Sequence, residues 1–162
     1  MSSGFDTKVE SFNLVNNMLP RIYYPNLQDN IFEQVTSYMA KQLLGNDMTI
    51  DYDQFLSKKP GKTKAAFAMH EDMGYWPKDT PDTKTATFCL ALTPSNKENG
   101  CLQFIPGSNK SKKIVKHKPI QLDPNKKNEN REDAHALVLD DKDIKGEVVH
   151  VEVPRGSITV HD

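Results

Sequence analysis

The spacing of apolar residues divides the chain into one helical stretch and a series of short strands. Between residues 29 and 45, apolar residues recur every three or four positions, which places them on one face of an amphipathic helix. Asp29 or Asn30 can cap the start of this helix, and Gly45 can end it. We expect its apolar face to pack against the outside of the fold. Residues 1–28 mix Asn, Ser and Pro with scattered apolar positions, which predicts an irregular lead-in.

After Gly45 the pattern changes to short apolar runs separated by clusters of Pro, Gly, Asn and Asp. The predicted strands are residues 48–56, 65–70, 83–93, 101–105, 136–139, 147–153 and 157–160. Many short strands with a single helix are typical of a mainly β jelly roll rather than of a parallel α/β sheet. Antiparallel closure of such a barrel would bring residues that are distant in the sequence together at its mouth.

A polar insertion, residues 109–135, interrupts the strands. It carries several basic residues among Asn, Asp and Pro: Lys110, Lys112, Lys113, Lys116, Lys118, Lys126, Lys127 and Arg131. Connections of this length are usually lids or disordered segments. The charges could attract an anionic substrate such as a carboxylate or a phosphate ester, or the segment could be a solvated loop. We expect His117 and His135, within this segment, to be exposed rather than metal ligands.

Composition narrows the function classes. The chain has 162 residues, 36% hydrophobic and 27% charged, which is enough for one domain with a modest core. The net charge of −1 gives no broad basic field, so nucleic acid is not expected as a partner. No apolar run approaches the length of a membrane span. Cys89 and Cys101 lie in predicted strands as isolated thiols, which favours reduced cysteines and a cytoplasmic protein.

The residues with the clearest chemistry are His70 and Asp72. Side chains two positions apart on an extended strand project to the same side, so an imidazole and a carboxylate at this spacing can bind one metal ion. They form two-thirds of the facial triad that binds non-haem Fe(II), and a second His would have to supply the third ligand. The alternative is a solvated His and Asp at a strand end or turn.

The residues around His70 and Asp72 resemble a known family. The matching blocks are residues 53–61, 70–77, 90–92, 98–102 and 105–108. In order and spacing they resemble the phytanoyl-CoA dioxygenase family, from about residue 43 to the end of the chain, with little resemblance between residues 111 and 146. The resemblance implies an Fe(II)- and 2-oxoglutarate-dependent oxygenase built on a double-stranded β-helix (jelly roll, cupin-like) with a flanking N-terminal helix.

The same resemblance assigns roles to individual residues. His70 and Asp72 would be iron ligands and catalytic residues, and Lys58 would bind 2-oxoglutarate or lie near the substrate, unless it is an ordinary exposed lysine. Cys89 stands where the family often has a Trp, in the wall of the co-substrate pocket. Tyr75 and Trp76 would form one wall of the substrate pocket, or else pack at the rim against the helix. Gln54 and Phe67 are further candidates for that pocket.

The end of the chain departs from the family pattern. In the family, a segment like residues 154–162 leads into a second His ligand and then an Arg that binds the far carboxylate of 2-oxoglutarate; neither is present here. His161 falls several residues short of the ligand position. We therefore expect His161 to be a barrel-strand residue close to the site and the third ligand to lie beyond Asp162. Residues 1–162 would then form one partial oxygenase domain, with the helix at 29–45 and the β-barrel core at 46–162.

Two functions follow from these patterns. The first is an Fe(II)- and 2-oxoglutarate-dependent dioxygenase that uses O2 to hydroxylate a small organic substrate and releases succinate and CO2. A carboxylate at position 72 favours hydroxylation, because related halogenases have a small residue there. The alternative is a jelly-roll binding module with a degenerate metal site.

Overall fold

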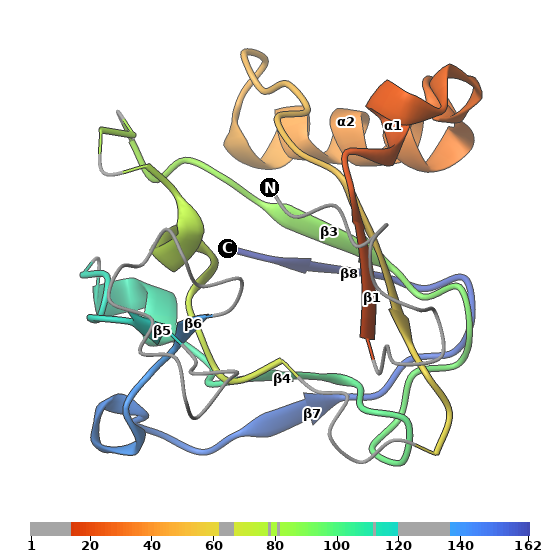
Figure 1. The fold of residues 1–162 in the computed structure, drawn as a ribbon. Helices are drawn as coiled ribbons and strands as arrows, with labels where there is room; N and C mark the ends of the chain where they lie inside the picture. The colour runs from red at the N-terminus through yellow and green to blue at the C-terminus, as the bar shows by residue number, and fades with distance from the viewer. Residues whose placement is uncertain (1–13, 62–66, 78, 81, 112, 120–136) are drawn as a thin grey trace.

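The fold is strand-rich with few helices (Figure 1). The structure is a computed structural model, and it describes residues 14–61, 67–77, 79–80, 82–111, 113–119 and 137–162. Within these residues, the strands pair antiparallel in four two-stranded ladders. No helix of the described part is long and apolar enough to cross a membrane.

Three of the four ladders are nested in the sequence. The strands are β1 (Leu14–Met18) with β2 (Gln54–Lys58), β3 (Thr87–Leu90) with β8 (Ile158–His161), β4 (Leu102–Phe104) with β7 (Val149–Val151), and β5 (Lys118–Pro119) with β6 (Leu137–Val138). The order β3·β8, β4·β7, β5·β6 is that of one long hairpin whose strands pair from the outside inward. This order is compatible with a jelly roll. The described ladders are not joined into two continuous sheets, so the double-stranded β-helix stays a prediction.

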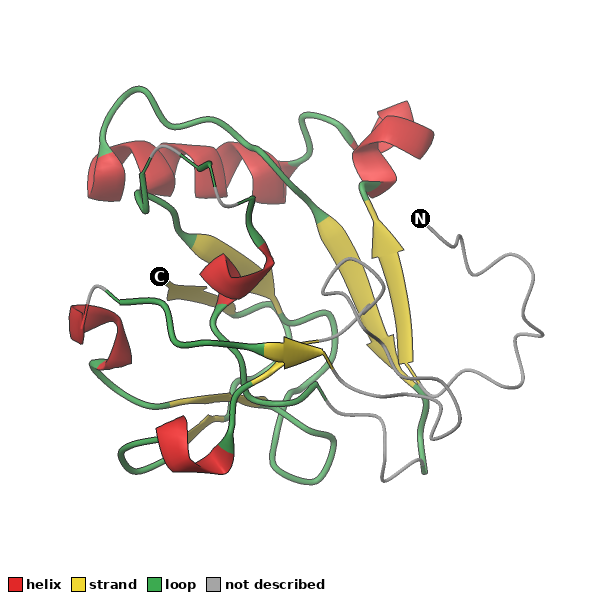
Figure 2. Cartoon of the chain, turned by 60° about the vertical axis from the view of Figure 1, so that its left-hand side comes forward, coloured by secondary structure: helices red, strands yellow, loops and turns green. Residues whose placement is uncertain are grey.

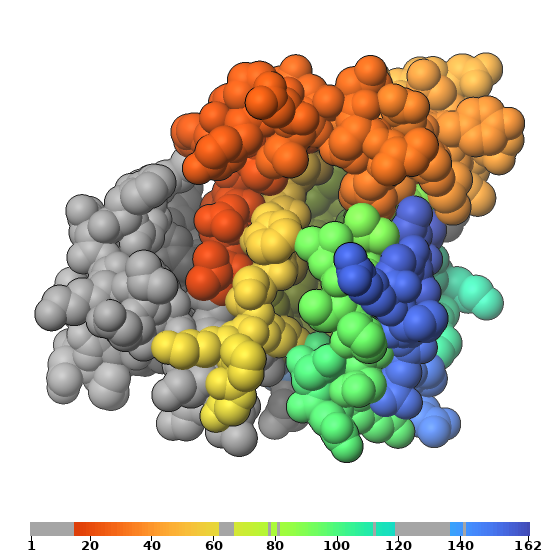
Figure 3. All heavy atoms as spheres, turned by 90° about the vertical axis from the view of Figure 1, so that its right-hand side faces the viewer, coloured from red at the N-terminus to blue at the C-terminus, as the bar shows by residue number. Residues whose placement is uncertain are grey.

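Helical segments lie across one end of these strands (Figures 1 and 3). They are α1 (Pro20–Tyr23), the 3-10 turn η3 (Pro25–Leu27) and α2 (Ile31–Leu44). The predicted helix is confirmed as α2, and so are its two ends. The side chain of Asn30 accepts a hydrogen bond from the Glu33 N–H, and Gly45 leaves the helix with a φ of 121°, which favours glycine.

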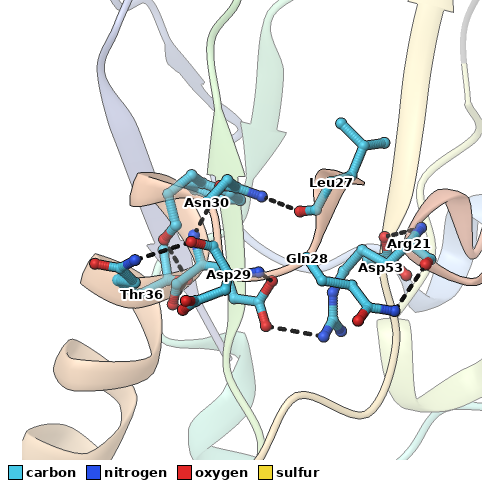
Figure 4. A network of polar contacts seen from close by, with 10 residues as sticks. Arg21, Leu27, Gln28, Asp29, Asn30, Thr36 and Asp53 are labelled. Carbon is cyan, nitrogen blue, oxygen red and sulfur yellow. Dashed lines mark hydrogen bonds and ion pairs between the residues drawn. The ribbon is translucent and has the colours of Figure 1, made fainter. Parts of the chain in front are cut away.

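A polar network fastens α1 to the start of α2 (Figure 4). An Arg21 guanidinium nitrogen lies 2.8 Å from Glu33 Oε1, and the Arg21 backbone N–H donates to Asp53 Oδ2 at 3.2 Å. Glu33 also accepts the backbone N–H of Asp29 at 2.8 Å through its other oxygen. The start of α2 is therefore tied both to its own cap and to the segment that leads into β2.

The Asn30 cap gives a first prediction. Replacing Asn30 with Ala should lower the free energy of unfolding by about 1 kcal/mol, because the Glu33 N–H loses its acceptor. Asn30→Ser keeps an acceptor at the cap and should cost only a small part of this. Urea denaturation followed by circular dichroism measures both variants; equal losses for Ala and Ser would contradict the capping role.

The prediction that the apolar face of α2 packs inward is only partly correct. Ile31, Tyr38 and Leu43 are 74%, 65% and 61% exposed. The inward side consists instead of buried Thr36 with half-buried Phe32 and Met39, which are spaced by four and three residues and so share one face. Thr36 can be buried because its hydroxyl donates to the Phe32 carbonyl at 2.8 Å.

Several predicted segments differ from the structure. The lead-in 1–28 was expected to be irregular but contains β1, α1 and η3. Residues 15–18 of β1 are exposed, and β1 is held by backbone pairing with β2, which no local pattern reveals. Residues 67–70 of the predicted strand 65–70 belong to no ladder, because a 3-10 turn, η4 (Asp72–Tyr75), begins at once after them. Within the insertion the structure has the 3-10 turn η5 (Ser108–Ser111) and β5, and η7 (Asp141–Asp143) follows β6. Residues 120–135 of the insertion, with His135, lie outside the described residues.

Candidate metal centre

His70 and Asp72 lie on the same side of the backbone. Glu71 between them is extended, with φ −104° and ψ 134°, so the side chains on either side of it point the same way. His70 Nε2 lies 3.4 Å from Asp72 Oδ1. The sequence therefore predicted the convergence correctly, although one extended residue followed by a 3-10 turn produces it, not a strand.

The other nitrogen of the His70 ring is held by the backbone. Nδ1 lies 2.7 Å from the Ala68 carbonyl oxygen, which can only accept a hydrogen bond, so Nδ1 carries a hydrogen. In the protonated ring, Nε2 also carries a hydrogen and donates it toward Asp72; once that proton is lost, Nε2 has a free lone pair. This is the tautomer that a histidine needs to bind a metal through Nε2, with its second nitrogen donating to an outer carbonyl.

The β3–β8 ladder supplies two further contacts to Asp72. Thr87 on β3 and His161 on β8 are directly paired across the ladder. The Thr87 hydroxyl donates to Asp72 Oδ2 at 2.9 Å, and His161 Nε2 lies 3.4 Å from the same oxygen. The two oxygens of the carboxylate are thus used differently: Oδ1 faces His70, and Oδ2 is held from β3 and β8.

His161 contacts Asp72 through the same nitrogen that would have to bind a metal. Its Nε2 lies as far from Asp72 Oδ2 as the Nε2 of His70 lies from Oδ1, 3.4 Å in both cases, and its buried Nδ1 has no hydrogen-bond partner among the described residues. No group of three or more His, Cys, Asp and Glu side chains in the described part of the chain is arranged to hold a metal ion. The arrangement is a candidate pair of ligands, His70 and Asp72, with His161 as a neighbour of the carboxylate.

His70 and Asp72 each stabilise the charged form of the other. The hydrogen bond from His161, followed by those from His70 and Thr87, holds the pKa of Asp72 far below its usual value, against the opposing effect of burial. The hydrogen bond to Asp72 raises the pKa of His70, again against burial. Asp72 is therefore an anion at neutral pH, as a metal ligand must be.

The raised pKa of His70 predicts a pH dependence for the metal-free protein. Because the folded-state pKa lies above the unfolded value of about 6.5, the stabilisation is fully present below that value and is lost as the pH rises through the folded-state pKa. We expect the thermal midpoint of the wild type, relative to that of His70→Asn, to fall as the pH rises above about 6.5. Thermal denaturation in the presence of a chelator tests this; parallel midpoints of the two proteins would contradict it.

Cys89 and two aromatic residues line the pair. Burial, followed by the negative charge of Asp72, raises the pKa of the half-buried Cys89 thiol on β3. The ring of Tyr75 stands edge-on to His70, with centroids 5.3 Å apart, and the ring of Phe67 lies 6.4 Å from His70. Tyr75 thus packs directly on the imidazole, and its hydroxyl accepts the Leu137 N–H at 2.8 Å. Trp76 is half-buried and directly follows η4.

The remaining predicted residues lie on β2. Gln54, at its start, has an exposed side chain. Lys58, at its end, donates through Nζ to the Gly100 carbonyl, so it links two of the sequence blocks that carry the family resemblance. Neither contact tests whether Lys58 binds the co-substrate or Gln54 binds the substrate, so both roles stay predictions.

Sequence reasoning missed Thr87 and Phe104 and misjudged His117. The ring of Phe104 on β4 lies 4.8 Å from that of His161. His117 was expected to be exposed, but it is half-buried and accepts the Glu71 N–H at 2.9 Å, because the insertion folds back onto the metal motif. These contacts join residues 46 or more positions apart, or depend on strand register, so no local pattern could have revealed them.

Comparison with known proteins identifies the family of the chain. The chain belongs to the phytanoyl-CoA dioxygenase (PhyH) family, whose model matches residues 6–162. It is 32% identical over 74 residues to an ectoine dioxygenase of Streptomyces avermitilis, which is 44% of this chain and 25% of that protein. It is also 32% identical over 88 residues to the dioxygenase lolE1 of Epichloe uncinata, which is 54% of this chain and 33% of that protein. The matches therefore span a quarter to a third of the length of these relatives. No solved structure matches significantly.

Proposed function

We propose that the chain belongs to an Fe(II)- and 2-oxoglutarate-dependent oxygenase that hydroxylates a small organic substrate. The observation that carries the proposal is the pairing of His70 Nε2 with Asp72 Oδ1, 3.4 Å apart, in a chain of the PhyH family. The donor set fits Fe(II), since an imidazole and a carboxylate are two of the three protein ligands in the non-haem iron triad.

Each residue of the site has a part in holding this pair. His70 and Asp72 would bind the metal, with the Ala68 carbonyl fixing the tautomer of His70. Thr87 and His161 hold Asp72 Oδ2, which leaves Oδ1 directed at His70. Tyr75 packs on the His70 ring and restricts its rotation. The bound iron would supply the oxidation of a substrate C–H bond to an alcohol, while 2-oxoglutarate and O2 yield succinate and CO2.

The co-substrate and the substrate are assigned to the residues around this pair. Cys89 would form part of the wall against 2-oxoglutarate, with Lys58 as a candidate for its carboxylate. Tyr75 and Trp76 would face the substrate, and Gln54 is a further candidate. Dioxygenases among the relatives support the oxygenase class. The carboxylate at position 72 supports hydroxylation rather than halogenation.

Anaerobic titration of the metal-free intact protein, which would include the expected third ligand, with Fe(II) tests the proposal. We expect one equivalent of Fe(II) to bind, and 2-oxoglutarate to tighten this binding because it adds two donors to the metal. Absence of Fe(II) binding both with and without 2-oxoglutarate would overturn the oxygenase. It would favour the second candidate, a jelly-roll binding module, which is supported by the finding that the described residues hold only a pair of ligands.

A further inference from the structure

Part of the insertion contacts the loop that carries the candidate metal ligands. We use the name insertion ribbon for residues 113–119 and 137–139, which include β5 and β6. On one side, the Val115 N–H donates to Glu71 Oε2 at 2.7 Å, and His117 Nε2 accepts the Glu71 N–H at 2.9 Å. Glu71 is therefore bound to the ribbon through both its backbone and its side chain.

The other strand of the insertion ribbon binds the two ends of the same loop. The Leu139 N–H donates to the Met69 carbonyl at 3.0 Å, and the Leu137 N–H donates to the Tyr75 hydroxyl at 2.8 Å. Leu137 and Leu139 are also among the most buried apolar residues of the described chain, with exposures of 2% and 8%. Val115 and His117 of the insertion, which bond to Glu71, are half-buried, so this part of the insertion is packed structure rather than a solvated loop. Figure 2 shows β5, one strand of the insertion ribbon, beside the short helical turn η4.

His117 also lies against the glycine that follows Asp72. A Cβ placed on Gly74 would lie 2.7 to 2.8 Å from three atoms of the His117 ring, closer than real contacts allow. Gly74 therefore leaves the space that lets His117 reach the Glu71 N–H. The His117 imidazole contacts the backbone on both sides of Asp72: it accepts a hydrogen bond from Glu71 and packs on Gly74.

This contact acts on the one backbone unit that determines the geometry of the ligands. His70 and Asp72 converge because Glu71 between them is extended, and the His117 acceptor fixes the direction of the Glu71 N–H. Since Nε2 accepts this bond, a neutral His117 carries its hydrogen on Nδ1. Outer contacts that orient metal ligands typically contribute ten- to a hundredfold to metal affinity.

We propose that His117 is a positioning residue of the metal centre: by accepting the Glu71 N–H and packing on Gly74, it keeps His70 and Asp72 convergent. The inference rests on the proposed function, because it takes these two residues as metal ligands. It gives the insertion, which the sequence left between a lid and a solvated loop, a defined role in assembling the site.

Fe(II) affinity measured anaerobically tests the proposal. His117→Ala should weaken Fe(II) binding by about tenfold, because the Glu71 N–H loses its acceptor. His117→Gln should recover most of the loss, since its amide oxygen can occupy the place of Nε2. Gly74→Ala should act in the same direction as His117→Ala, because the new methyl group displaces the ring. Lys113→Ala, an exposed position on the same segment, is the matched control and should bind Fe(II) like the wild type.

The thermal midpoint of each metal-free variant separates positioning from folding. Wild-type affinity in His117→Ala would overturn the proposal. So would a His117→Gln variant that binds as weakly as His117→Ala while keeping the wild-type midpoint, because the acceptor would then be irrelevant. If the wild type itself binds no Fe(II), the proposed function has failed, which is a different result from wild-type binding that is insensitive to His117.

Discussion

In the intact protein, replacing Asp72 with Ala should abolish Fe(II)-dependent succinate formation and reduce Fe(II) affinity by about a hundredfold or more. This exceeds the usual effect of removing an outer contact of a metal site, because the substitution deletes an anionic ligand itself. The carboxylate is ionised at neutral pH, since its hydrogen bonds with His161, His70 and Thr87 hold its pKa far below the usual range. No water molecule can replace this charge.

The fold should survive the change. The Asp72 side chain is 41% exposed, so Ala leaves little unfilled volume, and the thermal midpoint measured without metal should fall far less than the activity. Asp72→Glu should rescue poorly, because the extra methylene moves the carboxylate by about an ångström or more from its place beside His70. The measurement is an Fe(II) titration of wild type and both variants with 2-oxoglutarate present, following succinate. Undiminished turnover in Asp72→Ala would remove Asp72 from the ligands and leave the oxygenase assignment without its best residue.

The sequence predicted those parts of the molecule that depend on neighbouring residues. The helix α2 was predicted with its cap at Asn30 and its end at Gly45, because both signals act within one turn. The convergence of His70 and Asp72 was also predicted, since it requires only that Glu71 be extended. The predicted strand at 65–70 was wrong over its described residues 67–70, which form no ladder; a 3-10 turn begins at Asp72, and His117 of the insertion packs against it.

Contacts between distant segments were beyond the reach of sequence patterns. Thr87 lies beside Asp72 only because β3 pairs with β8 in a register that places Thr87 opposite His161. Nothing in an isolated Thr on a predicted strand signals this role. For the same reason His117, in a lysine-rich polar segment, was expected to be exposed, whereas it bonds to Glu71 across 46 residues of sequence.

The role of His161 gives the second large effect. If His161 holds Asp72 rather than the metal, His161→Ala should lower Fe(II)-dependent succinate formation by roughly ten- to a hundredfold without abolishing it. This role is supported by a shared contact, because His161 Nε2 lies 3.4 Å from Oδ2, the same carboxylate oxygen that accepts the Thr87 hydroxyl. A true ligand would instead give a loss as deep as that of Asp72→Ala.

Two further variants separate these roles of His161. His161→Gln can still donate an N–H to Asp72 Oδ2 from nearly the position of Nε2, so it should restore much of the activity, whereas an amide is a poor substitute for an imidazole ligand. Thr87→Val removes the other donor to the same oxygen at almost unchanged volume, and combined with His161→Ala it should give a non-additive loss. Succinate formation and Fe(II) affinity are measured for each variant. If His161→Gln loses both completely while Thr87→Val keeps both, His161 is a metal ligand. Partial losses in both single variants that fail to add would establish that the two residues act on one carboxylate oxygen, from neighbouring strands that the sequence separates by 74 positions.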